Sequence, residues 1–173
     1  PMGPSSIGFR AKDTMNRRVL VIGYGNVYCH DDGVGLHIVN SLRRLRGGKP
    51  LQPDEDGLDD LGGGIDAIMV HQLVPELASV VARYDQVIFV DAHLGQIEDE
   101  VRVVPLKKAY RFHAVTHHLS PETLLWMAEQ IKATEIKAYL VSVKGNDFDF
   151  GLGLTDGCAA RADLALERIL DLC

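Results

Sequence analysis

The stretch RVLVIGYGNVYCHDDGVGLHIVN, Arg18–Asn40, decides the fold of this 173-residue chain. It opens with the short, β-branched apolar run Val19–Ile22, which is typical of a buried strand. Two glycines then permit a sharp turn, and from Gly33 onward apolar residues recur at helical spacing. The pattern predicts a strand, an acidic loop and a helix. In an open parallel sheet such a loop lies at the carboxyl edge of the strands, where ligands bind.

Two adjacent carboxylates, Asp31 and Asp32, distinguish this loop from a phosphate-binding loop. The run G-Y-G-N-V-Y-C lacks the third glycine of the dinucleotide signature G-x-G-x-x-G, and no G-K-[ST] follows it. Two carboxylates at the start of a helix repel phosphate and suit a cation or acid–base chemistry. Either Asp alone is a favoured N-cap, but only one can occupy that position. The pair therefore favours a functional role for at least one of them.

The composition is that of an ordinary globular protein, and the length predicts one domain. A net charge of −6 gives no support to nucleic-acid binding or to attraction by anionic membranes. No apolar run approaches the roughly 20 residues of a membrane-spanning helix, so no membrane insertion is expected. The odd number of cysteines, without metal-finger spacing, indicates reduced thiols in a cytoplasmic protein. They are Cys29, Cys158 and Cys173.

The chain divides into a tail, one domain and one long loop. Residues 1–16 are polar and aperiodic, which predicts a flexible N-terminal tail before a single α/β domain over 17–173. The segment 47–64 holds six glycines, two prolines and five acidic residues, which predicts a mobile insertion loop. An ordinary surface insertion is favoured for it over a flap or a partner-contact loop.

The remaining apolar patterns alternate between strands and helices. The short connection before the fourth strand predicts that it pairs antiparallel with the strand preceding it, and Pro105 is tolerated there if it is an edge strand. The order predicts a three-layer α/β/α sandwich with a mostly parallel five-stranded sheet and one antiparallel edge strand. The later strands are expected at 67–71, 86–90, 100–106 and 136–143, and the later helices start near 75, 121 and 156.

Further polar residues stand at the ends of other elements. Asp91 follows an apolar strand and precedes no helix that it could cap. His117 and His118 precede the helix start at Ser120, and a helix N-terminus tends to keep an imidazole neutral. In a doubly wound sheet the loops of Asp32, Asp91 and His117 can converge on one crevice. This donor set suits a borderline divalent ion such as Zn, Ni, Fe or Co. The competing donors are His30, His71, His93, His113 and His118.

The central stretch resembles the signature of the hydrogenase maturation endopeptidases. These enzymes remove a C-terminal extension from the large subunit of nickel–iron hydrogenases. The family pattern has four motifs. The first is a strand, G-x-G-N, D-[DE]-x-x-G and a helix, and the second is a strand that ends in D-A. The third is a histidine before a helix, and the fourth is G-L-[ST] before the last helix. All four motifs occur in this order, at Val19–Ile38, Val87–Ala92, Thr116–Ser120 and Gly153–Thr155.

The resemblance implies both a site and an activity. Asp32, Asp91 and His117 match the metal-contacting residues, with His118 as the alternative because the doublet leaves the register open by one. The implied enzyme is a hydrolase, a cytoplasmic peptidase that acts on the precursor of a nickel–iron hydrogenase large subunit after nickel insertion. Nickel would be supplied by the substrate as a recognition element, and no tightly bound organic cofactor is expected. An aspartate or a metal-bound water could serve as the base.

One departure from the family pattern follows the second strand. The run His71–Leu77 stands where many members carry an acid-glycine-glycine-threonine turn, which indicates a subgroup variant and would place His71 near the site. Ordinary zinc and serine proteases are disfavoured, because the chain lacks H-E-x-x-H and G-x-S-x-G. The alternatives are a non-catalytic metal- or nucleotide-binding α/β module and another small hydrolase on a similar sheet.

Overall fold

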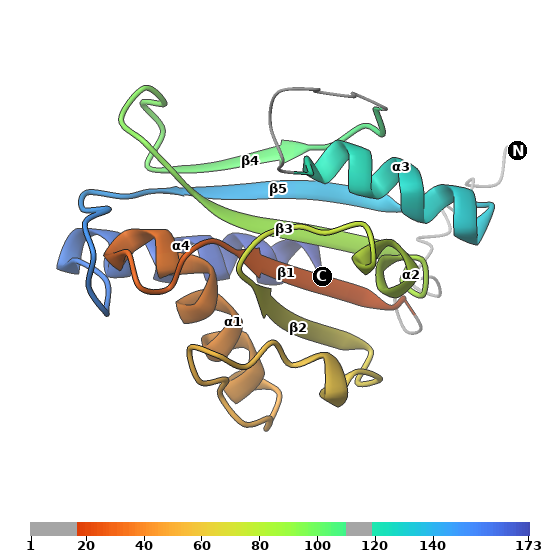
Figure 1. The fold of residues 1–173 in the computed structure, drawn as a ribbon, viewed down its shortest axis with the longest axis horizontal. Coiled ribbons are helices and arrows are strands. Elements are labelled where there is room, and N and C mark those ends of the chain that lie inside the picture. The colour runs from red at the N-terminus through yellow and green to blue at the C-terminus, as the bar shows by residue number, and fades with distance from the viewer. Residues whose placement is uncertain (1–16, 110–118) are drawn as a thin grey trace, which may run out of the picture.

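The computed structural model describes residues 17–109 and 119–173 (Figure 1). Within these ranges, a five-stranded sheet lies between two pairs of helices, which confirms the predicted three-layer α/β/α sandwich. The expected tail and the His117–His118 doublet lie outside the described residues. The strands are β1 (Val19–Tyr24), β2 (Ile65–Val70), β3 (Gln86–His93), β4 (Val101–Pro105) and β5 (Lys137–Lys144), and the α-helices are α1 (Val34–Leu45), α2 (Leu77–Val81), α3 (Pro121–Lys132) and α4 (Asp156–Leu172).

The sheet has the order β2-β1-β3-β5-β4, and only β4 runs antiparallel. The predicted antiparallel edge strand is therefore confirmed, but its predicted pairing with β3 is wrong, because it pairs with β5. The reason lies in burial: Val87–Val90 of β3 is fully buried and needs a strand on each side. Strand β4 is exposed at Val103 and ends in Pro105, which suits the edge position.

Each face of the sheet carries its own apolar layer. Helices α1 and α4 pack on one face through residues such as Ile38 and Ile169, and α2 and α3 cover the other through residues such as Leu77 and Leu124. Successive residues of β3 alternate between the two layers, as the period of a strand requires. Among the described residues, no helix is both long enough and apolar enough to cross a membrane.

Two hydroxyl caps start the later helices. The Ser120 hydroxyl accepts a hydrogen bond from the N–H of Thr123, and proline follows it at the first helical position, as predicted. Thr155 caps α4 by accepting a hydrogen bond from the N–H of Cys158. Both caps lie on the segments that lead to the carboxyl edge of the sheet, so they help to fix the loops there.

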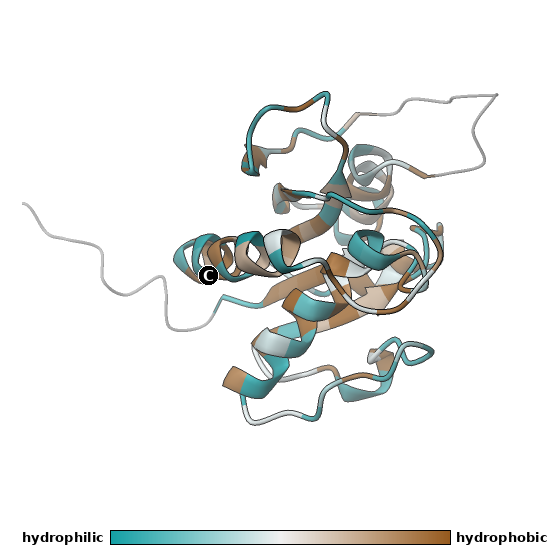
Figure 2. Cartoon of the chain, turned by 90° about the vertical axis from the view of Figure 1, so that its left-hand side faces the viewer, coloured by the Kyte–Doolittle hydropathy of each residue, from teal (hydrophilic) through white to brown (hydrophobic). Residues whose placement is uncertain are grey.

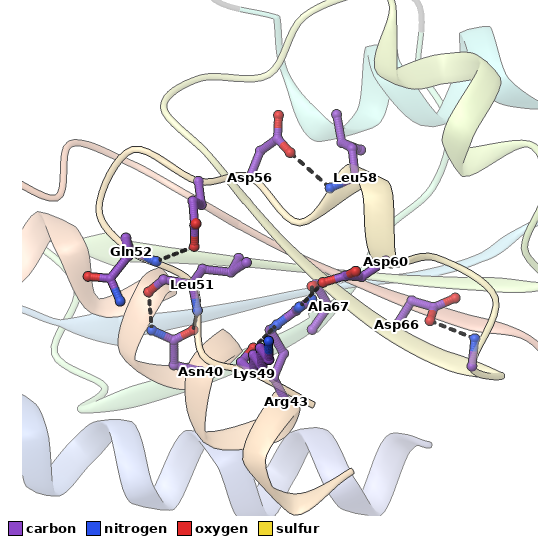
Figure 3. Close-up of polar contacts among 12 residues, drawn as sticks. Asn40, Arg43, Lys49, Leu51, Gln52, Asp56, Leu58, Asp60, Asp66 and Ala67 are labelled. Carbon is purple, nitrogen blue, oxygen red and sulfur yellow. Dashed lines mark hydrogen bonds and ion pairs between the residues drawn. The ribbon is translucent and has the colours of Figure 1, made fainter. Parts of the chain in front are cut away.

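The segment 47–64 is tied to α1 and β2 by side-chain contacts (Figure 3). The Asn40 amide exchanges two hydrogen bonds, of 2.9 and 2.7 Å, with the backbone of Leu51. The guanidinium of Arg43 donates to the carbonyl oxygens of Lys49 and Ala67 and pairs with the Asp60 carboxylate at 2.6 Å. These contacts fix both ends of the segment, and its mobility stays a prediction.

Replacing Arg43 by Met should destabilise the protein by about 2–3 kcal/mol, because the partly buried carbonyl oxygen of Lys49 and the buried one of Ala67 lose their charged donor. Urea denaturation of the parent and the variant measures this difference. Arg44→Met is the matched control, since Arg44 is exposed and should change stability by less than about 0.5 kcal/mol. Equal midpoints for both variants would contradict the anchoring role of Arg43.

Candidate active site

The β1–α1 loop lies at the carboxyl edge of the sheet, the edge that faces the viewer in Figure 2. Gly25 has a φ of +139°, and a Cβ there would come within 2.4 Å of the Asp32 carbonyl oxygen. The turn that brings Asp32 back against β1 therefore requires glycine at this position. A short 3-10 turn, His30–Gly33, follows and leads into α1.

Asp31 is completely buried and has a structural role. Its carboxylate accepts hydrogen bonds from the backbone N–H groups of Asn146, Asp147 and Thr155, and from the Thr155 hydroxyl, at 2.7–3.1 Å. Burial alone would raise the pKa of Asp31, but these four donors outweigh it and hold the pKa below its ordinary value. Neither Asp31 nor Asp32 caps α1, whose N-cap is Gly33. Asp31 thus joins the loop after β1 to the loop after β5.

Asp32 and Asp91 come together at the ends of the neighbouring strands β1 and β3. The Asp32 carboxylate accepts from the N–H of Asn26 at 2.6 Å, and the Asp91 carboxylate accepts from the N–H of Ala92 at 2.8 Å. Burial, which is the largest cause, and the nearby charge of Asp32 together raise the pKa of Asp91 to about 6, against the lowering effect of its hydrogen bonds with Ala92 and Tyr24. The structure therefore places two carboxylates, one of them titrating close to neutral pH, at one edge of the sheet.

Sequence reasoning missed Tyr24, the last residue of β1. Its hydroxyl donates a hydrogen bond to the Asp91 carboxylate, and burial, then the charges of Asp91 and Glu122, raise its pKa. Tyr24 therefore stays protonated and holds Asp91 from the side. The pairing of β1 with β3 places Tyr24 there: Gly23 pairs with Val90, so the next residues of the two strands, Tyr24 and Asp91, are neighbours.

The first turn of α3 approaches the same edge, because Glu122 is close enough for its charge to raise the pKa of Tyr24. The third expected ligand, His117, and its alternative, His118, precede this helix but lie outside the described residues. Their place at the site stays a prediction. Within the described ranges, no group of three histidine, cysteine or acidic side chains could hold a metal ion. The two carboxylates supply hard oxygen donors, and a cation between them would relieve their repulsion.

Three of the competing histidines lie in the described residues and have separate roles. His93 is buried, and because its Nε2 donates to the Asp99 carbonyl oxygen at 2.7 Å, its Nδ1 accepts from the Ser142 hydroxyl. His30 donates from Nδ1 to the Gly153 carbonyl oxygen at 3.0 Å. His71 is exposed beyond β2 and lines, with Gly25, a hollow of about 270 Å³. His71 is therefore the one of these three that lies free beside the β1–α1 loop.

Comparison with known proteins gives one curated relative. The chain is 28% identical over 156 residues to a protein of Methanocaldococcus jannaschii named "Putative hydrogenase maturation protease", and the match covers 88% of this chain and 94% of the relative. No family model matches the chain. The resemblance that the sequence motifs indicate is confirmed by this similarity.

Solved structures share the fold. The hydrogenase maturating endopeptidase HybD of E. coli matches with a TM-score of 0.60 and 22% identity, over 90% of this chain and 91% of its own. The [NiFe] hydrogenase maturation protease HycI of Thermococcus kodakarensis matches with a TM-score of 0.63 and 17% identity, over 92% of this chain and 94% of its own. At such identities the likeness concerns the fold, which is the α/β sandwich of these proteases.

Asp31→Ala should destabilise the protein by about 3 kcal/mol or more, because three partly buried N–H groups and a hydroxyl lose their charged acceptor. Asp32→Ala should cost about 1 kcal/mol or less, since it removes one such bond. Chemical denaturation at pH 7 compares the two variants. Because the pKa of Asp31 is lowered, its contribution is present above about pH 4 and is lost as the pH falls below that value. Equal losses for both variants would contradict the division of roles.

Asp91→Asn should stabilise the protein at pH 7.5. The folded pKa of Asp91 is raised from 3.8 to about 6, so the folded state binds the proton more tightly and the ionised side chain costs up to about 3 kcal/mol at neutral pH. The gain in the free energy of unfolding should shrink as the pH falls from 6 and vanish near pH 4. Denaturation curves across this range measure it, and a gain that is independent of pH would contradict the assignment.

Proposed function

We propose that this protein is a hydrogenase maturation endopeptidase that removes the C-terminal extension of a nickel–iron hydrogenase large-subunit precursor. The observation that carries the proposal is the meeting of Asp32 and Asp91, which match the family's carboxylates, at the carboxyl edge of a sheet shared with such proteases. The similarity to the M. jannaschii protein supports it over nearly the whole domain.

Nickel already bound to the precursor would serve as the recognition element. Asp32, Asp91 and His117 would complete the coordination of that ion, and the ion would offset the repulsion between the two carboxylates. Docking the ion also positions the neighbouring peptide bond, so that binding energy is converted into orientation. This explains a site with few donors of its own, because the client brings the remaining ligands.

In the metal-free site, Asp91 is suited to proton transfer near neutral pH, since its pKa there is about 6. The hydroxyl of Tyr24 and the N–H of Ala92 hold its carboxylate in a fixed orientation. In this proposal the peptidase is aspartate-assisted, and Asp91 accepts a proton from the attacking water with a carboxylate oxygen that does not bind the nickel. All three cysteines lie in the described residues as free thiols, which supports a cytoplasmic setting for the reaction.

The test is incubation with a nickel-loaded large-subunit precursor, followed by mass spectrometry. The parent protein should release one discrete C-terminal peptide. Asp32→Ala, Asp91→Ala and His117→Ala should each slow the release by about 100-fold or more. Asp171→Ala is the control, because this exposed carboxylate lies at the end of α4.

Two outcomes would contradict the proposal. A precursor whose mass is unchanged by the parent protein would favour a binding module, and normal processing by Asp91→Ala would remove the central role of that residue. Comparison of His117→Ala with His118→Ala decides the register of the histidine doublet. Thermal unfolding of each variant separates a lost activity from a lost fold.

A further inference from the structure

A second hollow, of about 340 Å³, lies behind the β1–α1 loop and is named here the α1 groove. One wall is the exposed side of α1, and the other is the segment 152–154 before α4. Its floor is apolar, because Val27, Leu36 and Leu154 are partly buried and pack against the core. Leu152 stands in the wall with 63% of its surface exposed. The lining residues are Val27, His30, Gly33, Leu36, His37, Asn40, Arg44, Pro53, Leu152, Gly153 and Leu154.

The walls of the α1 groove are held together by backbone contacts. The N–H of His30 donates to the Gly151 carbonyl oxygen at 2.9 Å, and the N–H of Gly151 donates to the Tyr28 carbonyl oxygen at 2.7 Å. The bonds of His30 to Gly153 and of Asp31 to Thr155 continue this seam. The groove is therefore preformed, and a ligand would not have to order it on binding.

The α1 groove carries a positive charge at Arg44. Among the described residues, its lining contains no carboxylate, although Asp163 lies 3.8 Å from the His37 ring outside it. The adjoining hollow, on the side of Gly25, is lined by Asp54, Glu55 and Asp56 instead. Val27 and Pro53 line both hollows, so the two hollows are neighbours. A carboxylate on a bound chain is therefore repelled from this acidic hollow and attracted to the α1 groove.

The position of the two hollows relates them to the candidate active site. Gly25 lines the acidic hollow, and a Cβ on this residue would lie 3.2 Å from the Asp32 carboxylate. Gly33, the residue after Asp32, lines the α1 groove, so a polypeptide bound at Asp32 has both hollows within reach. In an extended chain, alternate side chains point the same way, so residues i and i+2 would enter the groove together.

We propose that the α1 groove binds an extended segment of the client polypeptide, with an apolar side chain against Leu36 and Leu152 and a carboxylate two residues away at Arg44. This rests on the proposed function, since the client is the chain that the candidate active site cleaves. The α1 groove, which lies outside the pair Asp32 and Asp91, would then select the client by its sequence. It also gives a reason for the exposed Leu152, which would be covered in the complex.

The test measures binding without cleavage. Two fluorescein-labelled decapeptides are used, in which Leu and Glu, or Leu and the neutral isostere Gln, alternate with glycine. By fluorescence anisotropy, the Leu/Glu peptide should bind the parent protein at least about tenfold more tightly than the Leu/Gln peptide. Leu152→Asp and Arg44→Glu should each weaken the Leu/Glu peptide by about tenfold or more. Ile131→Asp is the matched control, because Ile131 is 59% exposed on α3 and lies outside the groove.

Processing of the nickel-loaded precursor by the same variants separates this inference from the proposed function. Leu152→Asp and Arg44→Glu should raise KM by about tenfold and leave kcat unchanged. Equal binding of the two peptides, or variants that process the precursor as the parent does, would overturn the groove and leave the peptidase intact. Selective peptide binding without any processing by the parent would keep the groove as a peptide site and overturn the peptidase and the client assignment.

Discussion

The buried carboxylate of Asp31 is the interaction on which the carboxyl edge of the sheet depends. It accepts four hydrogen bonds from a loop more than 110 residues away in the sequence. A buried charge is tolerable only when it is so completely paired, and the pairing then fixes both loops relative to each other. The loop after β1 and the loop before α4 therefore behave as one rigid unit. The turn that carries Asp32 and one wall of the α1 groove both belong to it.

The short 3-10 turn, His30–Gly33, directs its side chains to different parts of the edge. Its consecutive residues point in different directions, whereas residues three apart lie above one another. Asp31 points inward to the hydrogen-bond donors, and Asp32 points toward β1 and the Asp91 side of the sheet. His30 and Gly33, three apart, both line the α1 groove. One four-residue turn thus separates a structural carboxylate, a candidate catalytic carboxylate and a binding surface.

Local patterns made most of the fold predictable. The apolar run Val19–Ile22, the proline after Ser120 and the alternation of strands and helices depend on neighbours in the sequence, and the structure follows them. The partner of β4 was not predictable from its short connection, because β5, which takes the place beside β3, comes later in the chain. For the same reason, the different roles of Asp31 and Asp32 could not be read from the loop itself, since the donors to Asp31 lie at 146–155. Tyr24 was missed because its contact with Asp91 arises from the register between strands.

The electrostatics of the edge connect the carboxylate pair to the two hollows. Asp91 keeps a pKa of about 6 because burial and the charge of Asp32 outweigh the hydrogen bonds from Ala92 and Tyr24. At neutral pH the two ionised carboxylates repel each other, and a bound cation would relieve this repulsion. The acidic hollow beside Gly25 extends the same negative field. Under the proposed function, a client chain that carries a cation would be drawn to this side, while its own carboxylates would be directed to Arg44 on the far side of the turn. The negative field at the carboxylates and the positive field at Arg44, on opposite sides of the β1–α1 loop, would then orient a client before its side chains make contact with the protein.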